Sequence, residues 1–82
     1  MEKSISSREQ QILCRLLKQI RKGNGLSQAE LAQLLDEPQS FVSRYERGQQ
    51  RLDILEVRHV CRAVGVSLPD FSQRLESLFN DS

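Results

Sequence analysis

The short joint between two adjacent predicted helices constrains the fold of this chain more than any other sequence feature. Apolar residues recur at helical spacing over 28–35 and again over 39–47, and only Asp36-Glu37-Pro38 separates the two runs. Pro cannot continue a helix but fits its first turn, so the pattern breaks here. Two helices of about two turns each, joined this tightly, must cross steeply, and the small side chain of Ala32 allows their close approach.

Capping signals divide the rest of the chain in the same way. A Ser or Asp three residues before an acid can satisfy free amides at a helix start. The candidate pairs are Ser6 with Glu9, Ser27 with Glu30, Asp53 with Glu56, and Ser67 with Asp70. Gly23-Asn24-Gly25 and Gly65 are stop signals. We therefore predict five helices, at about 8–22, 28–35, 39–47, 54–64 and 68–80.

Each predicted helix has an apolar stripe that can face a common core. The inward residues are expected to be Ile12, Leu13, Leu16, Leu17 and Ile20; Leu31, Ala32, Leu34 and Leu35; Val42 and Tyr45; Ile54, Val57, Val60, Cys61 and Val64; and Phe71, Leu75, Leu78 and Phe79. With 82 residues, no Trp and a hydrophobic share of 38%, the chain has room for one small core of mainly Leu, Ile and Val. We expect a single all-α domain over residues 1–82.

Several classes of function are disfavoured by the composition. No apolar run approaches the ~20 residues of a membrane span, and the polar start lacks a signal-peptide pattern, so we expect a cytoplasmic chain. Cys14 and Cys61 are 47 positions apart and cannot form a zinc site with the single His59 by any usual spacing. We expect free thiols, an ordinary surface or edge role for His59, and no metal, cofactor, small-molecule ligand or catalytic activity.

The charge distribution is more informative than the net charge of +1. Residues 1–62 carry 11 Lys and Arg against 8 Asp and Glu, a balance of +3. Residues 63–82 carry 1 basic residue against 3 acidic ones, a balance of −2. A polyanion is therefore expected to meet the first three quarters of the chain.

These features together resemble a known family. The steeply crossed pair over about 28–47 is a helix-turn-helix, and the segment LSQAELAQLLDEPQSFVSRYERGQQRLDILEVRHVCRAVGVS resembles the lambda-repressor and Cro-like helix-turn-helix domains of the XRE family. The resemblance covers about residues 8–72. It implies a five-helix lambda-repressor-like fold that binds double-stranded DNA, with the third helix in the major groove and the second across the backbone.

The resemblance also implies roles for individual residues. Gln39, Ser40 and Arg44 match base-reading positions, although which of Gln39 and Ser40 reaches a base stays open. Contacts to the DNA backbone are expected from Gln28, Ser43, Arg47, Arg51 and Lys22. Arg21 and Glu46 match an ion pair that ties the first helix to the third, the alternative being two separate surface charges.

The joint departs from the family pattern. Gly is usual where Asp36 stands, although Asp tolerates a left-handed backbone better than most residues. An apolar residue is usual at Glu37, and a capping Ser or Thr at Pro38. Phe41 can either touch thymine methyl groups or cover the joint between the helices, and we favour packing.

We expect a bacterial or phage transcriptional regulator, more often a repressor at this size, that binds a pseudo-palindromic operator as a homodimer. The apolar stripe of the last helix, with Leu75, Leu78 and Phe79, is the expected dimer surface. The alternative is an antitoxin-like or coactivator-like protein-interaction module on the same fold. An RNA-binding module is disfavoured, because few aromatic side chains are available for base stacking.

Overall fold

A computed structural model describes residues 7–81, which form five α-helices. They are α1 (Arg8–Gly23), α2 (Gln28–Leu35), α3 (Gln39–Glu46), α4 (Ile54–Ala63) and α5 (Leu68–Asp81). Every helix begins and ends within one residue of its predicted bounds, and no strand occurs between residues 7 and 81. The predicted five-helix, all-α fold is confirmed.

Side chains next to each helix start explain most of these bounds. Ser27 and Glu30 form a complete capping box, in which the Ser27 hydroxyl accepts from the Glu30 amide at 3.0 Å and the Glu30 carboxylate accepts from the Ser27 amide at 2.8 Å. Asp53 and Glu56 form another, with bonds of 2.8 and 2.9 Å. The Ser67 hydroxyl accepts from the Asp70 amide at 3.2 Å.

The predicted cap of α1 was wrong by one residue. Ser7 caps this helix, and its hydroxyl accepts from the Gln10 amide at 3.1 Å. Ser6 lies outside the described residues. A cap needs only the backbone amide three residues on, so an acid at that position is a helpful signal and not a requirement.

The turn between α2 and α3 depends on a left-handed residue. Asp36 has φ 58° and ψ 43°, and the Glu37 amide reaches back to the Ala32 carbonyl at 2.9 Å. Gly adopts this conformation freely, whereas Asp costs of order 1 kcal/mol more. Pro38 then opens α3 without any side-chain cap. The turn therefore reverses the chain in three residues despite its departures from the family pattern.

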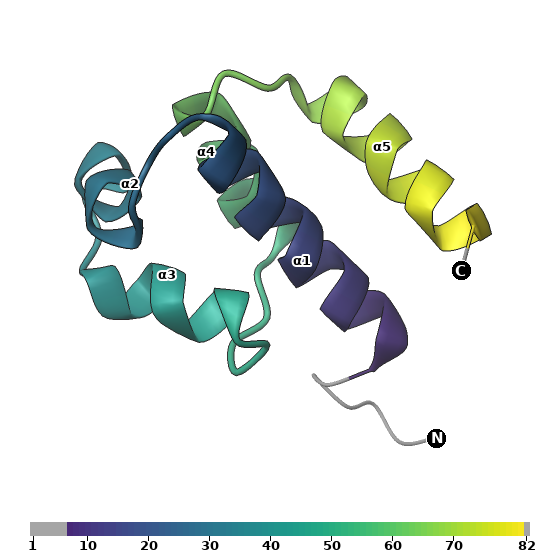
Figure 1. The fold of residues 1–82 in the computed structure, drawn as a ribbon, viewed down its shortest axis with the longest axis horizontal. Coiled ribbons are helices and arrows are strands. Elements are labelled where there is room, and N and C mark those ends of the chain that lie inside the picture. The colour runs from purple at the N-terminus through teal and green to yellow at the C-terminus, as the bar shows by residue number, and fades with distance from the viewer. Residues whose placement is uncertain (1–6, 82) are drawn as a thin grey trace.

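The core lies where all five helices meet. α1 crosses the middle of the molecule, with α2 and α3 on one side and α5 on the other (Figure 1). Leu17, Leu31, Val42, Val60 and Phe71 are among its fully or almost fully buried side chains.

Two aromatic side chains of α3 contact each other in the core. Phe41 is 7% exposed and meets the ring of Tyr45 edge to face, with centroids 5.5 Å apart. The packing role favoured for Phe41 is confirmed. Tyr45 is fully buried, its hydroxyl has no hydrogen-bond partner within the described residues, and burial raises its pKa.

Three residues of the expected inward stripes lie at the surface. Leu34 is 57% exposed, Ile54 is 63% exposed, and Leu78, which was also expected at a dimer surface, is 37% exposed. α2 is only eight residues long, and Leu34 lies beside its buried stripe, at the edge of a shallow pocket that it shares with α4. Ile54 is the first residue of α4, ahead of the turn where Val57 first enters the core.

Both thiols are free, and Cys61 is buried as expected; Cys14 is buried as well. Burial raises the pKa of Cys14 and of Cys61, which disfavours their reactive thiolate forms. None of the helices described is long and apolar enough to cross a membrane.

Candidate nucleic-acid interface

The outward face of α3 is polar and free of acids. Phe41, Val42 and Tyr45 point into the core, which leaves the other side of this two-turn helix to the solvent. Gln39, Ser40 and Arg44 are exposed there and Ser43 is half-buried. Ser40 and Arg44 are four residues apart, so they lie one helical turn from each other on the same face.

A chain of side-chain amides connects the starts of α2 and α3. The Gln28 amide group donates to a Glu46 carboxylate oxygen at 3.0 Å, and the Gln39 amide group donates to the Gln28 carbonyl oxygen at 3.5 Å. Gln28 is the first residue of α2, where the helix dipole and backbone amides favour an anion. This arrangement fixes Gln28 beside the outward face of α3.

A buried ion pair holds the far end of α3 in place. Arg21 binds both carboxylate oxygens of Glu46, with Nε to Oε2 at 2.7 Å and Nη2 to Oε1 at 3.0 Å. The two side chains are only 8% and 2% exposed. Arg21 Nη1 also donates to the Leu26 carbonyl at 2.8 Å, so a single guanidinium joins α1, the following loop and α3. The hydrogen bonds with Glu46 raise the pKa of Arg21.

Four exposed cations lie on α3 or on the segments that precede α2 and follow α3. Arg44 and Arg47 bond neutral partners, Gln50 at 3.1 Å and Gln49 at 3.3 Å respectively. Arg51 and Lys22 are exposed as well. Within residues 7–81 the ion pairs are Arg21 with Glu46 and Arg74 with Asp70, so no carboxylate neutralises these four cations. The arrangement suits a polyanion whose groove edges present hydrogen-bond acceptors.

Comparison with known proteins identifies the fold family. The model of the helix-turn-helix family HTH_3 matches residues 17–71, more than half of the chain. The chain belongs to this helix-turn-helix family. A comparison with curated protein sequences gives no match.

Solved structures with the same fold span most of this HTH_3 chain. An XRE-family like protein from Pseudomonas syringae pv. tomato is 38% identical, with 85% of each chain covered and a TM-score of 0.79. The wild-type restriction-modification controller protein C.Esp1396I is 22% identical over 94% of this chain and 100% of its own, with a TM-score of 0.86. Its tetramer in complex with a natural 35-base-pair operator is 24% identical over 88% and 95%, with a TM-score of 0.81. Both controller structures show likeness of fold alone.

Several polar contacts in the HTH_3 domain were not predicted from the sequence. They include the bond from Gln28 to Glu46, the bond of Gln49 to Arg47 just after α3, and the bond of Gln50 to Arg44 of α3. The first joins residues 18 positions apart, and the other two depend on the path of the loop after α3. Neither local residue spacing nor apolar periodicity predicts such contacts.

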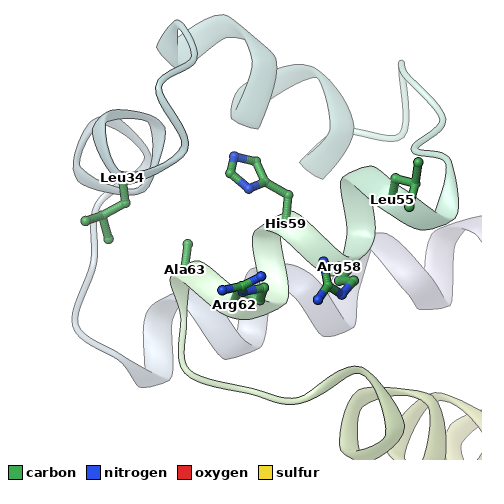
Figure 2. A pocket seen from close by; sticks show the side chains of 6 residues that line it. All are labelled: Leu34, Leu55, Arg58, His59, Arg62 and Ala63. Atoms are coloured by element: carbon green, nitrogen blue, oxygen red, sulfur yellow. The ribbon is translucent and has the colours of Figure 1, made fainter.

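The HTH_3 domain also has a shallow pocket between α2 and α4, away from the outward face of α3. Leu34 and Leu55 lie at its opposite ends, with Arg58 and Arg62 between them (Figure 2). The His59 imidazole lies 3.1 Å from the Leu35 carbonyl at the end of α2, as an edge residue that satisfies a helix terminus. Among the described residues, no group of three or more His, Cys, Asp or Glu side chains could hold a metal ion.

Proposed function

We propose that this chain is a sequence-specific double-stranded DNA-binding protein that regulates transcription in a bacterium or phage, acting as a repressor. The observation that carries the proposal is the outward face of α3, which presents Gln39, Ser40 and Arg44 beside cations that no carboxylate neutralises. The chain acts by binding and not by catalysis. It works in the cytoplasm as one domain over residues 1–82.

The base-reading residues have the chemistry that the major groove requires. Arg44 can donate two hydrogen bonds to guanine O6 and N7, and Gln39 can both donate to and accept from adenine. Ser40 can donate or accept one turn before Arg44. Gln28, Ser43, Arg47, Arg51 and Lys22 supply contacts to phosphates, which set the register of α3 in the groove.

The comparisons support this proposal. The chain is 38% identical to an XRE-family like protein, and the controller C.Esp1396I, which has the same fold, has been solved on its operator DNA. The operator belongs to that protein, and DNA binding by this chain is inferred from its own α3 face.

Binding is expected to weaken steeply as salt rises. With about four to six phosphate contacts per subunit, log affinity should fall with log salt at a slope of about −4 to −5, because counterions are released. Affinity should drop roughly 10²- to 10³-fold per subunit between about 50 and 200 mM salt. Fluorescence anisotropy with a labelled duplex measures this slope.

Arg74→Ala is the control for the salt series. Arg74 is paired with Asp70 on α5, so its loss should leave the slope unchanged. A nearly flat dependence in the wild-type chain would contradict the DNA proposal. It would favour an antitoxin-like or coactivator-like module, for which Leu34 and Leu55 offer an exposed apolar surface.

We propose that the chain acts as a homodimer through the end of α5, with recognition helices set for half-sites about one DNA turn apart. Leu75 is half-buried and packs against the core of its own subunit, and Phe79 is half-buried. Leu78 is 37% exposed and lines a groove with Ile12 and Leu16 of α1. Leu78 is therefore the main exposed apolar residue on this surface.

The dimer should sediment at twice 9.4 kDa at micromolar concentration, and Leu78→Glu should convert it to monomer. Leu55→Glu is the matched control, since Leu55 is 72% exposed at the start of α4. If only Leu55→Glu dissociates the dimer, the interface is at α4. A 9.4 kDa species alone, with and without operator DNA, would rule out the dimer.

A further inference from the structure

The loop after α3 returns toward the recognition helix. Gly48 has a φ of 75°. The Gly48 amide donates to the Tyr45 carbonyl at 3.0 Å, and the Gln49 amide donates to the Arg44 carbonyl at 2.8 Å. This paired pattern is the Schellman motif, and it turns the chain back along the helix. The backbone thereby places Gln50 beside the side chain of Arg44.

Gln50 binds one defined edge of the Arg44 guanidinium. The bond runs from Arg44 Nε to Gln50 Oε1 at 3.1 Å. A guanidinium has two edges that can donate paired hydrogen bonds, one formed by Nε with a terminal nitrogen and one formed by both terminal nitrogens. With Nε engaged, only the edge with the two terminal nitrogens stays free for a paired contact.

That free edge matches guanine, which presents the O6 and N7 acceptors side by side in the major groove. We propose that Gln50 is a positioning residue for base readout, which holds Arg44 so that both terminal nitrogens are directed at one guanine. The proposal rests on the proposed DNA-binding function. A long exposed arginine is otherwise free to sample many rotamers, and holding it in place before binding reduces the entropy lost on contact.

The neighbouring pair of residues does not select an edge in this way. Arg47 bonds Gln49 through a terminal nitrogen, Nη2, at 3.3 Å. This nitrogen belongs to both edges of the guanidinium, so the bond assigns neither of them. Of the two pairs, only Arg44 with Gln50 leaves one defined edge for a paired contact.

The orientation of the Gln50 amide follows from the same bond. Arg44 Nε can only donate, so Gln50 must present its oxygen and turn its amino group away. Gln50→Met removes the acceptor while keeping the length of the side chain. Gln50→Glu keeps an acceptor and removes the amino donors. Because it also adds a negative charge that weakens binding to all duplexes, the affinity ratio between duplexes is the quantity that separates positioning of Arg44 from direct contact with DNA.

The test measures base preference in the full chain. Duplexes selected from a random pool define the preferred guanine, and a matched duplex replaces that base pair alone. We expect Gln50→Met to lower the affinity ratio between these duplexes by about threefold to tenfold, with affinity for random DNA changed less than about twofold. Gln50→Glu should retain the ratio, and Gln49→Met, the matched control, should leave it unchanged.

A double-variant cycle makes the result independent of small folding effects. If Gln50 acts through Arg44, adding Gln50→Met to Arg44→Ala should change the ratio no further. An unchanged ratio in Gln50→Met, or an equal loss on all duplexes, overturns the positioning role while leaving DNA binding intact. A wild-type chain that selects no sequence from the pool would instead overturn the proposed function itself.

Discussion

Replacing Glu46 with Ala should lower the free energy of unfolding by about 3–5 kcal/mol, because it leaves the buried Arg21 guanidinium without its partner carboxylate. The Arg21 guanidinium is almost completely enclosed and would keep only its bond to the Leu26 carbonyl. A domain of this size is stable by roughly 4–12 kcal/mol, so the loss is a large part of the total. Urea denaturation followed by circular dichroism measures the change.

Two further variants show whether the effect belongs to the pair. Glu76→Ala removes an exposed carboxylate from α5 and should change stability by less than about 0.5 kcal/mol. Arg21→Met combined with Glu46→Leu removes both charges and should recover much of the loss, since apolar replacements of buried pairs are often tolerated. A loss below about 1 kcal/mol in Glu46→Ala would show that solvent screens this pair as it screens surface pairs.

Replacing Arg44 with Ala should weaken binding to the preferred duplex by about 1–3 kcal/mol for each half-site and relax the preference at one base pair. Folding should be intact, because Arg44 is exposed and the hydrogen bond of its side chain goes to the loop residue Gln50. Affinities for preferred, singly substituted and random duplexes, measured at one salt concentration, separate loss of specificity from loss of affinity.

Arg51→Ala is the comparison for Arg44→Ala. As a contact to the DNA backbone, Arg51 should weaken binding to all sequences alike and reduce the salt slope by about 1. If Arg44→Ala behaved in the same way, Arg44 would be a phosphate ligand. Base readout would then have to come from Gln39 and Ser40.

The helices could be predicted from sequence because their ends depend on near neighbours. Ser27, Pro38 and Asp53 act on amides or backbone angles within about one turn, so the printed order of residues contains the signal. Leu34 and Ile54 were misplaced because periodicity shows which face is apolar but not how far the neighbouring helix extends to cover it.

The candidate site could likewise be predicted only where it depends on near neighbours in the sequence. Once Val42 and Tyr45 are assigned to the core, the outward residues of α3 follow from helical geometry, and the structure does leave Gln39, Ser40 and Arg44 exposed. The bonds of Gln28 to Glu46 and of Gln50 to Arg44 could not be predicted. Each forms between residues brought together by the path of the chain, with no local pattern to indicate it.

The brevity of α3 limits how much information one subunit can read. Eight residues at a rise of 1.5 Å make a rod of about 12 Å, which at 3.4 Å per base pair spans about four base pairs. A fixed sequence of that length occurs by chance about once in 256 positions, whereas a genome offers roughly 10⁶ or more positions. One subunit would thus meet thousands of chance matches, and even two subunits reading about eight base pairs would meet tens. Further discrimination therefore has to come from sequence-dependent DNA shape or from additional copies bound at fixed spacing on the same stretch of DNA.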